Sequence, residues 1–355
     1  MNGNLNRKIF GIFTFSGILL IICPATHGGP VGFNYFDSGS QTPFFIKDSI
    51  PFWADLNVDE NEIKLELDLL APEGSKEYAG KKSIHRLIRF LRIKKKFRDK
   101  KLARRLYRFL AKESASLKLY PQAMAFYAKA LEPDDGSIKL DEGSLALIDS
   151  IKQPEQDDEK VESRPTTISD LVGTFSNNKR AFAYAIILHV KQPVPGKRNA
   201  FNGLDNVGHT FITLIKYNSD QSVDSRSFGF YPDKNSNISA TPLHPGAPSV
   251  FKDDGSHDWD EVIGKFISRR RFDKIIRLLD KYENKHYDLN ESNCTDFGLN
   301  AAALCGIQIF QTENSWPLGR GNNPASAGQS ILEGKLLNTD TMNQDELFLS
   351  NSILK

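Results

Sequence analysis

The spacing of apolar residues divides the chain into a helical part followed by a part dominated by strands. Between residues 82 and 131, apolar side chains recur at the three- and four-residue spacing of an amphipathic helix. The stripe consists of Ile84, Leu87, Ile88, Leu91, Leu102, Leu106 and Leu110. Beyond about residue 168 the pattern changes to short runs rich in β-branched and aromatic residues, which are typical of strands.

The second part of the chain predicts an α+β domain. Strands are expected at Ala181–Val190, Gly208–Lys216, Ser227–Tyr231 and Val262–Ser268, and helices at Arg269–Tyr282 and Cys294–Cys305. Polar, turn-like residues 217–224 separate two of the strands, so we expect an antiparallel hairpin there. A polar segment from Lys234 to Asp258 is expected as an inserted loop, and Tyr287–Leu289 as a short strand.

Composition shifts set the expected domain boundaries. Residues 151–166 are acidic, contain proline and lack an apolar period, which indicates a linker. We expect a signal peptide at 1–25, mostly irregular structure at 26–80, a helical region at 81–150, the linker at 151–168, the α+β domain at 169–335 and a tail at 336–355. Residues Tyr120–Leu131 are similar to the second helix of a tetratricopeptide repeat. Only one such unit is visible and a stable array needs about three, so we expect a small helical hairpin or bundle.

The N-terminus has the layout of a secretory signal. Arg7 and Lys8 precede an uncharged apolar run from Ile9 to Cys23, and small residues follow, with Ala25 as the expected cleavage site. The run is shorter than the roughly 20 residues that a membrane-spanning helix needs. Two alternatives stay open, a lipid attached to Cys23 and an uncleaved hydrophobic anchor. We therefore expect an exported protein, whether periplasmic, on the outer surface or secreted.

Charge and cysteine content exclude several classes of function. The chain of 355 residues has 46 Lys and Arg against 44 Asp and Glu, a net charge of +2, which argues against a general nucleic-acid coat. Lys81–Arg108 nevertheless holds fourteen basic residues and one acid. That segment is either a surface for an anionic polymer, a lipid headgroup or a partner, or a solvated helix face balanced by acidic neighbours; the overall balance favours the second.

No metal site and no cofactor are expected. Three cysteines cannot build a multi-bridge disulfide scaffold or a four-cysteine zinc site. The sequence also lacks closely spaced pairs of the His-x-x-x-His or Cys-x-x-Cys type. Cys305 lies eleven residues beyond Cys294, a rise of about 16.5 Å along a helix, whereas a disulfide needs Cα atoms within about 7 Å. Cys305 is therefore expected in the core, and Cys294 is expected to be unpaired.

Cys294 is the candidate nucleophile. Ser292 or Asn293 can cap the predicted helix, and Asp296 suits its first turn. The thiol would then lie at the positive end of the helix, where the thiolate is favoured and the pKa falls. The alternative is that Cys294 is a small buried hydrophobe without chemistry, which is the commoner role of a buried cysteine.

His209 is the candidate base because it begins a strand that would hold it firmly. If the turn centred near Asp220 closes a hairpin, His209 lies opposite Tyr231–Asp233. Asp233 or Tyr231 would then orient the imidazole, with Asp233 preferred since a carboxylate better stabilises an imidazolium. His189, at the end of an apolar strand, is the fallback base.

These residues resemble motifs of circularly permuted papain-like cysteine enzymes of the NlpC-type superfamily, in which the strand histidine precedes the helix cysteine. The matching pieces are Gly208-His209-Thr210-Phe211, Phe228-Gly229-Phe230-Tyr231-Pro232 and Tyr287 with Asn293-Cys294-Thr295-Asp296-Phe297. The resemblance covers about Phe182–Leu332. It implies a papain-like fold for the C-terminal domain, with an antiparallel sheet and a cysteine-bearing helix. It also implies Cys294 as nucleophile, His209 as base, a thioester acyl-enzyme, and a Cys294 backbone N–H that holds the oxyanion.

Three functions follow as hypotheses. The first is an exported cysteine peptidase or amidase, for which the resemblance suggests cell-wall peptide as substrate. The second is a lipid-directed acyltransferase or thioesterase of the same fold, which would use the basic segment at membranes. The third is a binding protein whose α+β domain carries no chemistry.

Overall fold

A computed structural model describes residues 12–15, 18–21, 100–131, 163–201, 206–233, 239–316 and 318–350. The chain divides into two compact units, one formed by Met1–Tyr107 with Ala128–Asp157 and the other by Arg108–Tyr127 with Asp158–Lys355. The expectations for residues 26–80, for the basic segment before Lys100 and for most of the linker lie outside the described residues. None of the helices in the described part is both long and apolar enough to cross a membrane.

Two short strands and two helices precede the main domain. Strand β1 (Ile12–Phe15) pairs antiparallel with β2 (Ile18–Ile21), inside the segment expected to be a signal peptide. Helices α3 (Lys100–Ser116) and α4 (Tyr120–Leu131) lie within the expected helical region. The export signal itself stays a prediction.

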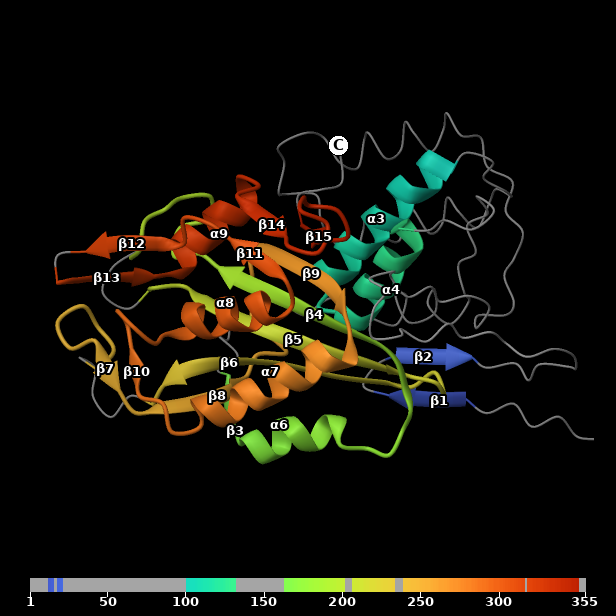
Figure 1. Cartoon of the computed structure of the whole chain (residues 1–355), viewed down its shortest axis with the longest axis horizontal. Coiled ribbons are helices and arrows are strands. Elements are labelled where there is room, and N and C mark those ends of the chain that lie inside the picture. Colours follow the sequence, from blue (N-terminus) through green and yellow to red (C-terminus); the bar gives the residue numbers. More distant parts are fainter. Residues whose placement is uncertain are drawn as a thin grey trace, which may run out of the picture. The chain divides into compact units, whose positions relative to one another are not determined.

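The second unit is built on a seven-stranded antiparallel sheet of order β15-β9-β4-β5-β6-β8-β3 (Figure 1). Its strands are β3 (Arg164–Thr166), β4 (Ala181–Lys191), β5 (His209–Asn218), β6 (Val223–Pro232), β8 (Ser249–Asp253), β9 (Glu261–Ile267) and β15 (Phe348–Leu349). Every residue of β5 is buried, because this strand lies at the centre of the sheet. The expected α+β class is confirmed at this level.

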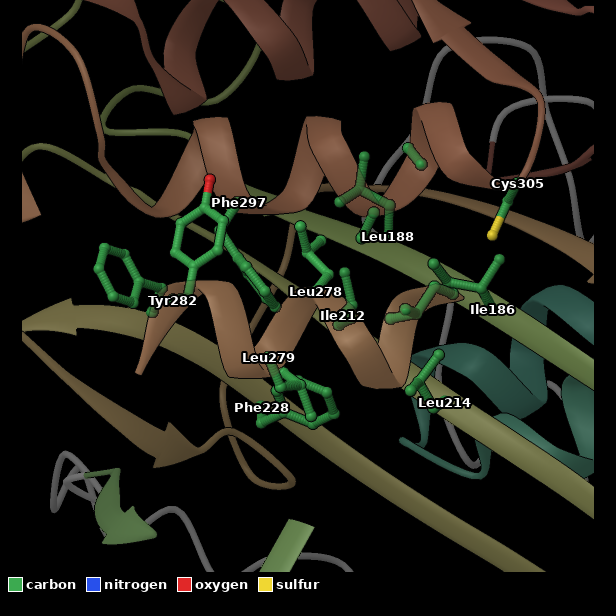
Figure 2. Packing of buried hydrophobic residues seen from close by; sticks show 14 of the residues in the cluster. Ile186, Leu188, Ile212, Leu214, Phe228, Leu278, Leu279, Tyr282, Phe297 and Cys305 are labelled. Atoms are coloured by element: carbon green, nitrogen blue, oxygen red, sulfur yellow. The ribbon is translucent and has the colours of Figure 1, made fainter. Parts of the chain in front are cut away.

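Helices cover one face of the sheet. They are α6 (Ile168–Phe175), α7 (Arg269–Tyr282), α8 (Cys294–Leu304) and α9 (Pro324–Leu332). Figure 2 shows Leu188 and Ile212 of the sheet packed with Leu279 of α7 and Phe297 of α8. Close approach of α8 requires Gly298, where a Cβ would lie 2.6 Å from Thr210 Cγ2.

Part of the helical hairpin packs against the same sheet. The Tyr120 ring lies 4.5 Å from the His189 ring, measured between centroids, and the Tyr217 hydroxyl donates a 2.6 Å hydrogen bond to the Pro121 carbonyl. A Cβ at Gly264 of β9 would lie 2.8 Å from Met124 Sδ. Residues 120–124 are therefore an integral part of this unit.

Three expected boundaries differ from the structure. The inserted loop Lys234–Asp258 contains β7 (Gly246–Ala247) and β8, and β8 belongs to the main sheet. The linker expected at 151–168 contains β3, and the tail expected at 336–355 contains β14 (Leu336–Asn338) and β15. These strands have two to five residues each, too few to show a period in the sequence.

Three small strand pairs complete the unit. Strand β7 pairs with β10 (Tyr287–Asp288), β11 (Ile307–Ile309) with β14, and β12 (Glu313–Trp316) with β13 (Gly319–Asn322). The first pair brings Tyr287 beside α8.

Candidate active site

Cys294 is the first residue of α8, as expected. The Asn293 side chain caps the helix by accepting hydrogen bonds from the backbone N–H groups of Thr295 and Asp296, at 2.8 and 3.1 Å. The Asp296 carboxylate in turn accepts from the Asn293 backbone N–H at 2.9 Å, which completes a capping box. The sequence left Ser292 and Asn293 open, and Asn293 is the cap.

His209 is the first residue of β5, also as expected. The residue before it, Gly208, has a φ of +72°, and a Cβ there would lie 2.4 Å from the Lys191 carbonyl oxygen. Only glycine fits both the backbone conformation and the space. Gly208 therefore allows the backbone turn that places His209 at the first position of β5, at the end of the sheet.

The imidazole of His209 lies close enough to the thiol of Cys294 for each group to shift the pKa of the other. Both side chains are almost fully buried, with exposures of 6% and 4%. Burial alone would raise the pKa of the Cys294 thiol, but the neighbouring imidazole of His209 and its positive charge outweigh burial and lower that pKa. The backbone N–H of Thr210 and the hydroxyl of Tyr287, 3.9 Å from the sulfur, add to this effect.

Asp254 holds the other side of the imidazole. Its Oδ2 lies 3.1 Å from His209 Nε2, which leaves the second ring nitrogen, Nδ1, outside this pair. Burial would lower the pKa of His209, but the charge and hydrogen bond of Asp254, aided by Cys294, raise it to about 9. An imidazolium is therefore the favoured form near neutral pH.

Asp254 is itself fixed in the ionised state. Its side chain is fully buried, and Oδ1 accepts hydrogen bonds from the Tyr231 hydroxyl at 2.5 Å and the Ser163 hydroxyl at 2.7 Å. Burial would raise the pKa of this carboxyl, yet His209 and the two hydroxyls lower it below its ordinary value. Ser163 directly precedes β3, so the edge strand also contributes to the site.

The expected third residue, Asp233, is corrected by this geometry. Asp233 is exposed at the end of β6, where its backbone N–H donates to the Pro248 carbonyl at 2.7 Å. Tyr231 lies beside the imidazole, with ring centroids 4.1 Å apart, but its hydroxyl binds Asp254 rather than a ring nitrogen. The orienting carboxylate comes from the end of β8, the next strand in the sheet. The only sequence signal for it is the Asp-Gly turn at Asp254–Gly255.

Gly229 of β6 leaves the space that the hydrogen-bonded side chains of His209 and Asp254 occupy. A Cβ at this position would lie 2.5 Å from Asp254 Oδ2 and 2.5 Å from His209 Nε2. No side chain fits at this position without displacing the hydrogen-bonded atoms.

The loop that carries Asp254 is held at a second point. The His257 ring lies 5.1 Å from the His209 ring, and its Nδ1 pairs with the Asp258 carbonyl at 2.8 Å. Lys118, between α3 and α4, forms a 2.9 Å ion pair with Asp258 and donates to the Ser256 carbonyl. The turn of the helical hairpin thus contacts the loop on which the orienting carboxylate lies.

His189, the fallback base, is unsuited to the role. It is completely buried in β4, and its Nε2 pairs with the Thr213 hydroxyl at 2.8 Å. Burial lowers the pKa of His189 to about 3, so its imidazole is neutral. A neutral ring cannot hold a thiolate as an ion pair.

Cys294 forms part of the wall of a cleft with about 290 Å³ of empty space, some of it open to solvent. The lining residues are Ala200, Phe201, Val207, Tyr287, Leu289, Asn293, Cys294, Trp316, Asn322, Asn323 and Pro324. Within the described residues, no three His, Cys, Asp or Glu side chains are grouped to hold a metal ion.

Comparisons with known proteins give no relative: no protein-family model, no curated protein and no solved structure matches this chain.

Proposed function

We propose that the protein is a cysteine hydrolase, a peptidase or amidase, that acts through Cys294. The observation that supports the proposal is the series Cys294–His209–Asp254, in which a thiol at the capped start of a helix lies beside an imidazole that a buried carboxylate holds by a hydrogen bond. A nucleophile, a base and a group that orients the base are the parts that covalent catalysis needs. Export and a cell-wall peptide substrate are further parts of the proposal, which rest on the N-terminal pattern and on the motif resemblance.

The reaction would begin with attack of the Cys294 thiolate on a carbonyl carbon. The new carbon–sulfur bond pushes the carbonyl electrons onto oxygen, which the backbone N–H of Cys294 at the start of α8 and the hydroxyl of Tyr287 beside the sulfur would stabilise. The His209 imidazolium then gives its proton to the leaving amine, which departs and leaves a thioester.

Hydrolysis of the thioester completes the cycle. His209, now neutral, takes a proton from water, and the resulting hydroxide attacks the thioester carbonyl. The carbon–sulfur bond breaks, the acid product leaves and the thiolate is restored. Asp254 keeps the imidazole oriented and stabilises its charged form in both halves of the cycle.

The experiment is to trap the acyl-enzyme. The purified full chain is mixed with an activated ester such as p-nitrophenyl butyrate, and the intact mass and the site of acylation are measured by mass spectrometry. We expect a single acyl group on Cys294 and release of p-nitrophenolate, both abolished by Cys294→Ala. The matched control, Cys305→Ala, should acylate like the unchanged protein because Cys305 is a fully buried residue of the core. Acylation that persists in Cys294→Ala, or that is absent from the folded protein, would refute the proposal.

A further inference from the structure

Asp254, the carboxylate that orients the base, directly follows β8 and is reached from both strands beside it. In the sheet, β8 lies between β6 and the edge strand β3. Asp253 pairs with Arg164 of β3, and the next pair in this antiparallel register sets Ser163 opposite Asp254. Tyr231 approaches the same carboxylate from β6. Each neighbouring strand therefore supplies one hydroxyl donor to Asp254.

The two donors act on one oxygen of the carboxylate and leave the other to His209. Oδ1 of Asp254 accepts from the Ser163 hydroxyl at 2.7 Å and from the Tyr231 hydroxyl at 2.5 Å, while Oδ2 lies 3.1 Å from His209 Nε2. The two hydroxyl oxygens are 3.3 Å apart, and each has one proton, which Oδ1 receives at the shorter distance. With a single donor, the carboxylate can pivot about that hydrogen bond and carry Oδ2 away from the ring. A second donor, held by a different strand, removes this freedom.

Ser163 has a fixed position because β3 is anchored on both sides. Strand β3 pairs with β8 along its three residues, and Thr167, which directly follows β3, is the N-cap of α6. Helix α6 packs in the hydrophobic core through Leu171 and Phe175. Ser163 thus lies only a few residues from a rigid helix, so its hydroxyl loses little freedom when it binds Asp254.

We propose that Ser163 is a positioning residue of the active site, which acts on catalysis through Asp254. This inference rests on the proposed function and adds to its site a residue from the segment expected as a linker. With Ser163 in place, Oδ2 of Asp254 stays directed at the ring of His209, and the imidazolium stays beside Cys294. Without it, Tyr231 alone holds Oδ1, the carboxylate turns more freely, and the imidazole spends less time in the reactive orientation.

Removal of the hydroxyl tests this role in the full chain. In Ser163→Ala we expect kcat on p-nitrophenyl butyrate to fall by about tenfold with KM unchanged, because the lost hydrogen bond orients the base and does not bind the ester. Ser163→Thr keeps a hydroxyl and should restore most of this loss. The matched control is Ser249→Ala in β8, which removes a half-buried hydroxyl that donates to the Lys285 carbonyl at 2.6 Å and should leave kcat unchanged.

A proton resonance supplies a readout that does not depend on activity. The Nε2 proton of His209, which faces Asp254, exchanges with water when their hydrogen bond opens. In Ser163→Ala we expect this exchange, measured by proton NMR, to become several times faster, because the carboxylate is freer to turn. In Ser163→Thr and Ser249→Ala the exchange rate should match that of the unchanged protein.

The outcomes separate this inference from the function on which it rests. A folded Ser163→Ala protein with unchanged kcat and unchanged exchange would overturn the positioning role and leave the chemistry of Cys294 standing. Equal losses of kcat in Ser163→Ala and Ser249→Ala would also overturn it, since the effect would then follow general destabilisation. Absence of turnover in the unchanged protein would overturn the proposed function, whereas faster Nε2 exchange in Ser163→Ala would still support the hold of Ser163 on Asp254.

Discussion

Two buried histidines on neighbouring strands differ in the direction of their pKa shifts. His189 of β4 and His209 of β5 are both shielded from water, yet the pKa of His189 falls to about 3 and that of His209 rises to about 9. The ring nitrogen Nε2 of His189 meets the neutral hydroxyl of Thr213, whereas that of His209 meets the carboxylate of Asp254. The burial that both share favours the neutral ring, so the carboxylate decides the difference.

The two buried cysteines at the ends of α8 repeat the contrast. Burial raises the pKa of the Cys305 thiol to about 12, while the imidazolium of His209 lowers that of Cys294. Cys305 is packed in the core with Ile186 and other apolar residues (Figure 2). Histidine and cysteine therefore serve packing in one region and form a charged pair in the other. The buried carboxylate of Asp254 accounts for this difference.

Removing that carboxylate should have the largest effect. In Asp254→Asn we expect kcat/KM on an activated ester to fall by about 100-fold or more, because the imidazole loses its orienting charge. The pH profile supplies a second readout. The Cys294–His209 pair is active above the lowered pKa of Cys294 and below the His209 pKa of about 9. Because Asp254→Asn lowers the pKa of His209, the alkaline limb of the kcat/KM profile moves to lower pH.

The matched control for this prediction is Asp233→Asn. Asp233 is exposed, and its isosteric replacement should change kcat/KM by less than about twofold and leave both limbs in place. The reverse result, a large loss in Asp233→Asn and little in Asp254→Asn, would show that the orienting residue has been misassigned.

A smaller loss is expected from Gly229→Ala. The added methyl would lie 2.5 Å from both atoms of the His209–Asp254 hydrogen bond and would push them apart. We expect kcat to fall by about tenfold or more, since a displacement of about 1 Å can cost that much or more. The expected loss of unfolding free energy is about 1–3 kcal/mol, measured by urea denaturation. A variant with unchanged kcat would mean that the close approach at Gly229 does not hold the pair in place.

The smallest effect on activity is expected in the packing region. Cys305→Ala removes a buried sulfur at the opposite end of α8 from Cys294, so kcat should stay unchanged. The free energy of unfolding should drop by about 1 kcal/mol, because the substitution leaves a small cavity. Steady-state kinetics on the folded protein and urea titration measure the two quantities separately. A loss of kcat in a folded Cys305→Ala protein would contradict the division of roles between the cysteines.

The sequence predicts the positions of Cys294 and His209 because each has a local signal. Asn293 and Asp296 indicate where α8 begins, and Gly208 followed by an apolar run indicates the start of β5. The long central strands β4 and β5 show a clear run of apolar residues for the same reason. These features depend only on residues that are close together in the chain.

Asp254 could not be found in this way. It lies 45 residues from His209 along the chain and reaches the imidazole only because β8 pairs with β6. Strand β8 has five residues with one buried side chain, Phe251, so it gives no period that would distinguish it from a loop. The register argument correctly placed Tyr231 near His209, but the carboxylate came from a strand that the sequence did not reveal.

The central claim is that Cys294 is a thiolate held by an imidazolium, and its rate of alkylation across pH tests this most directly. Iodoacetamide labelling of Cys294 is followed by mass spectrometry from about pH 5 to pH 9, with the His209→Ala variant and a simple thiol in parallel. If His209 holds Cys294 as a thiolate, Cys294 is labelled much faster than the simple thiol at pH values well below about 7. This rate advantage is lost in His209→Ala. Labelling that rises only near the ordinary thiol pKa of about 8.5, equally in both proteins, would contradict it.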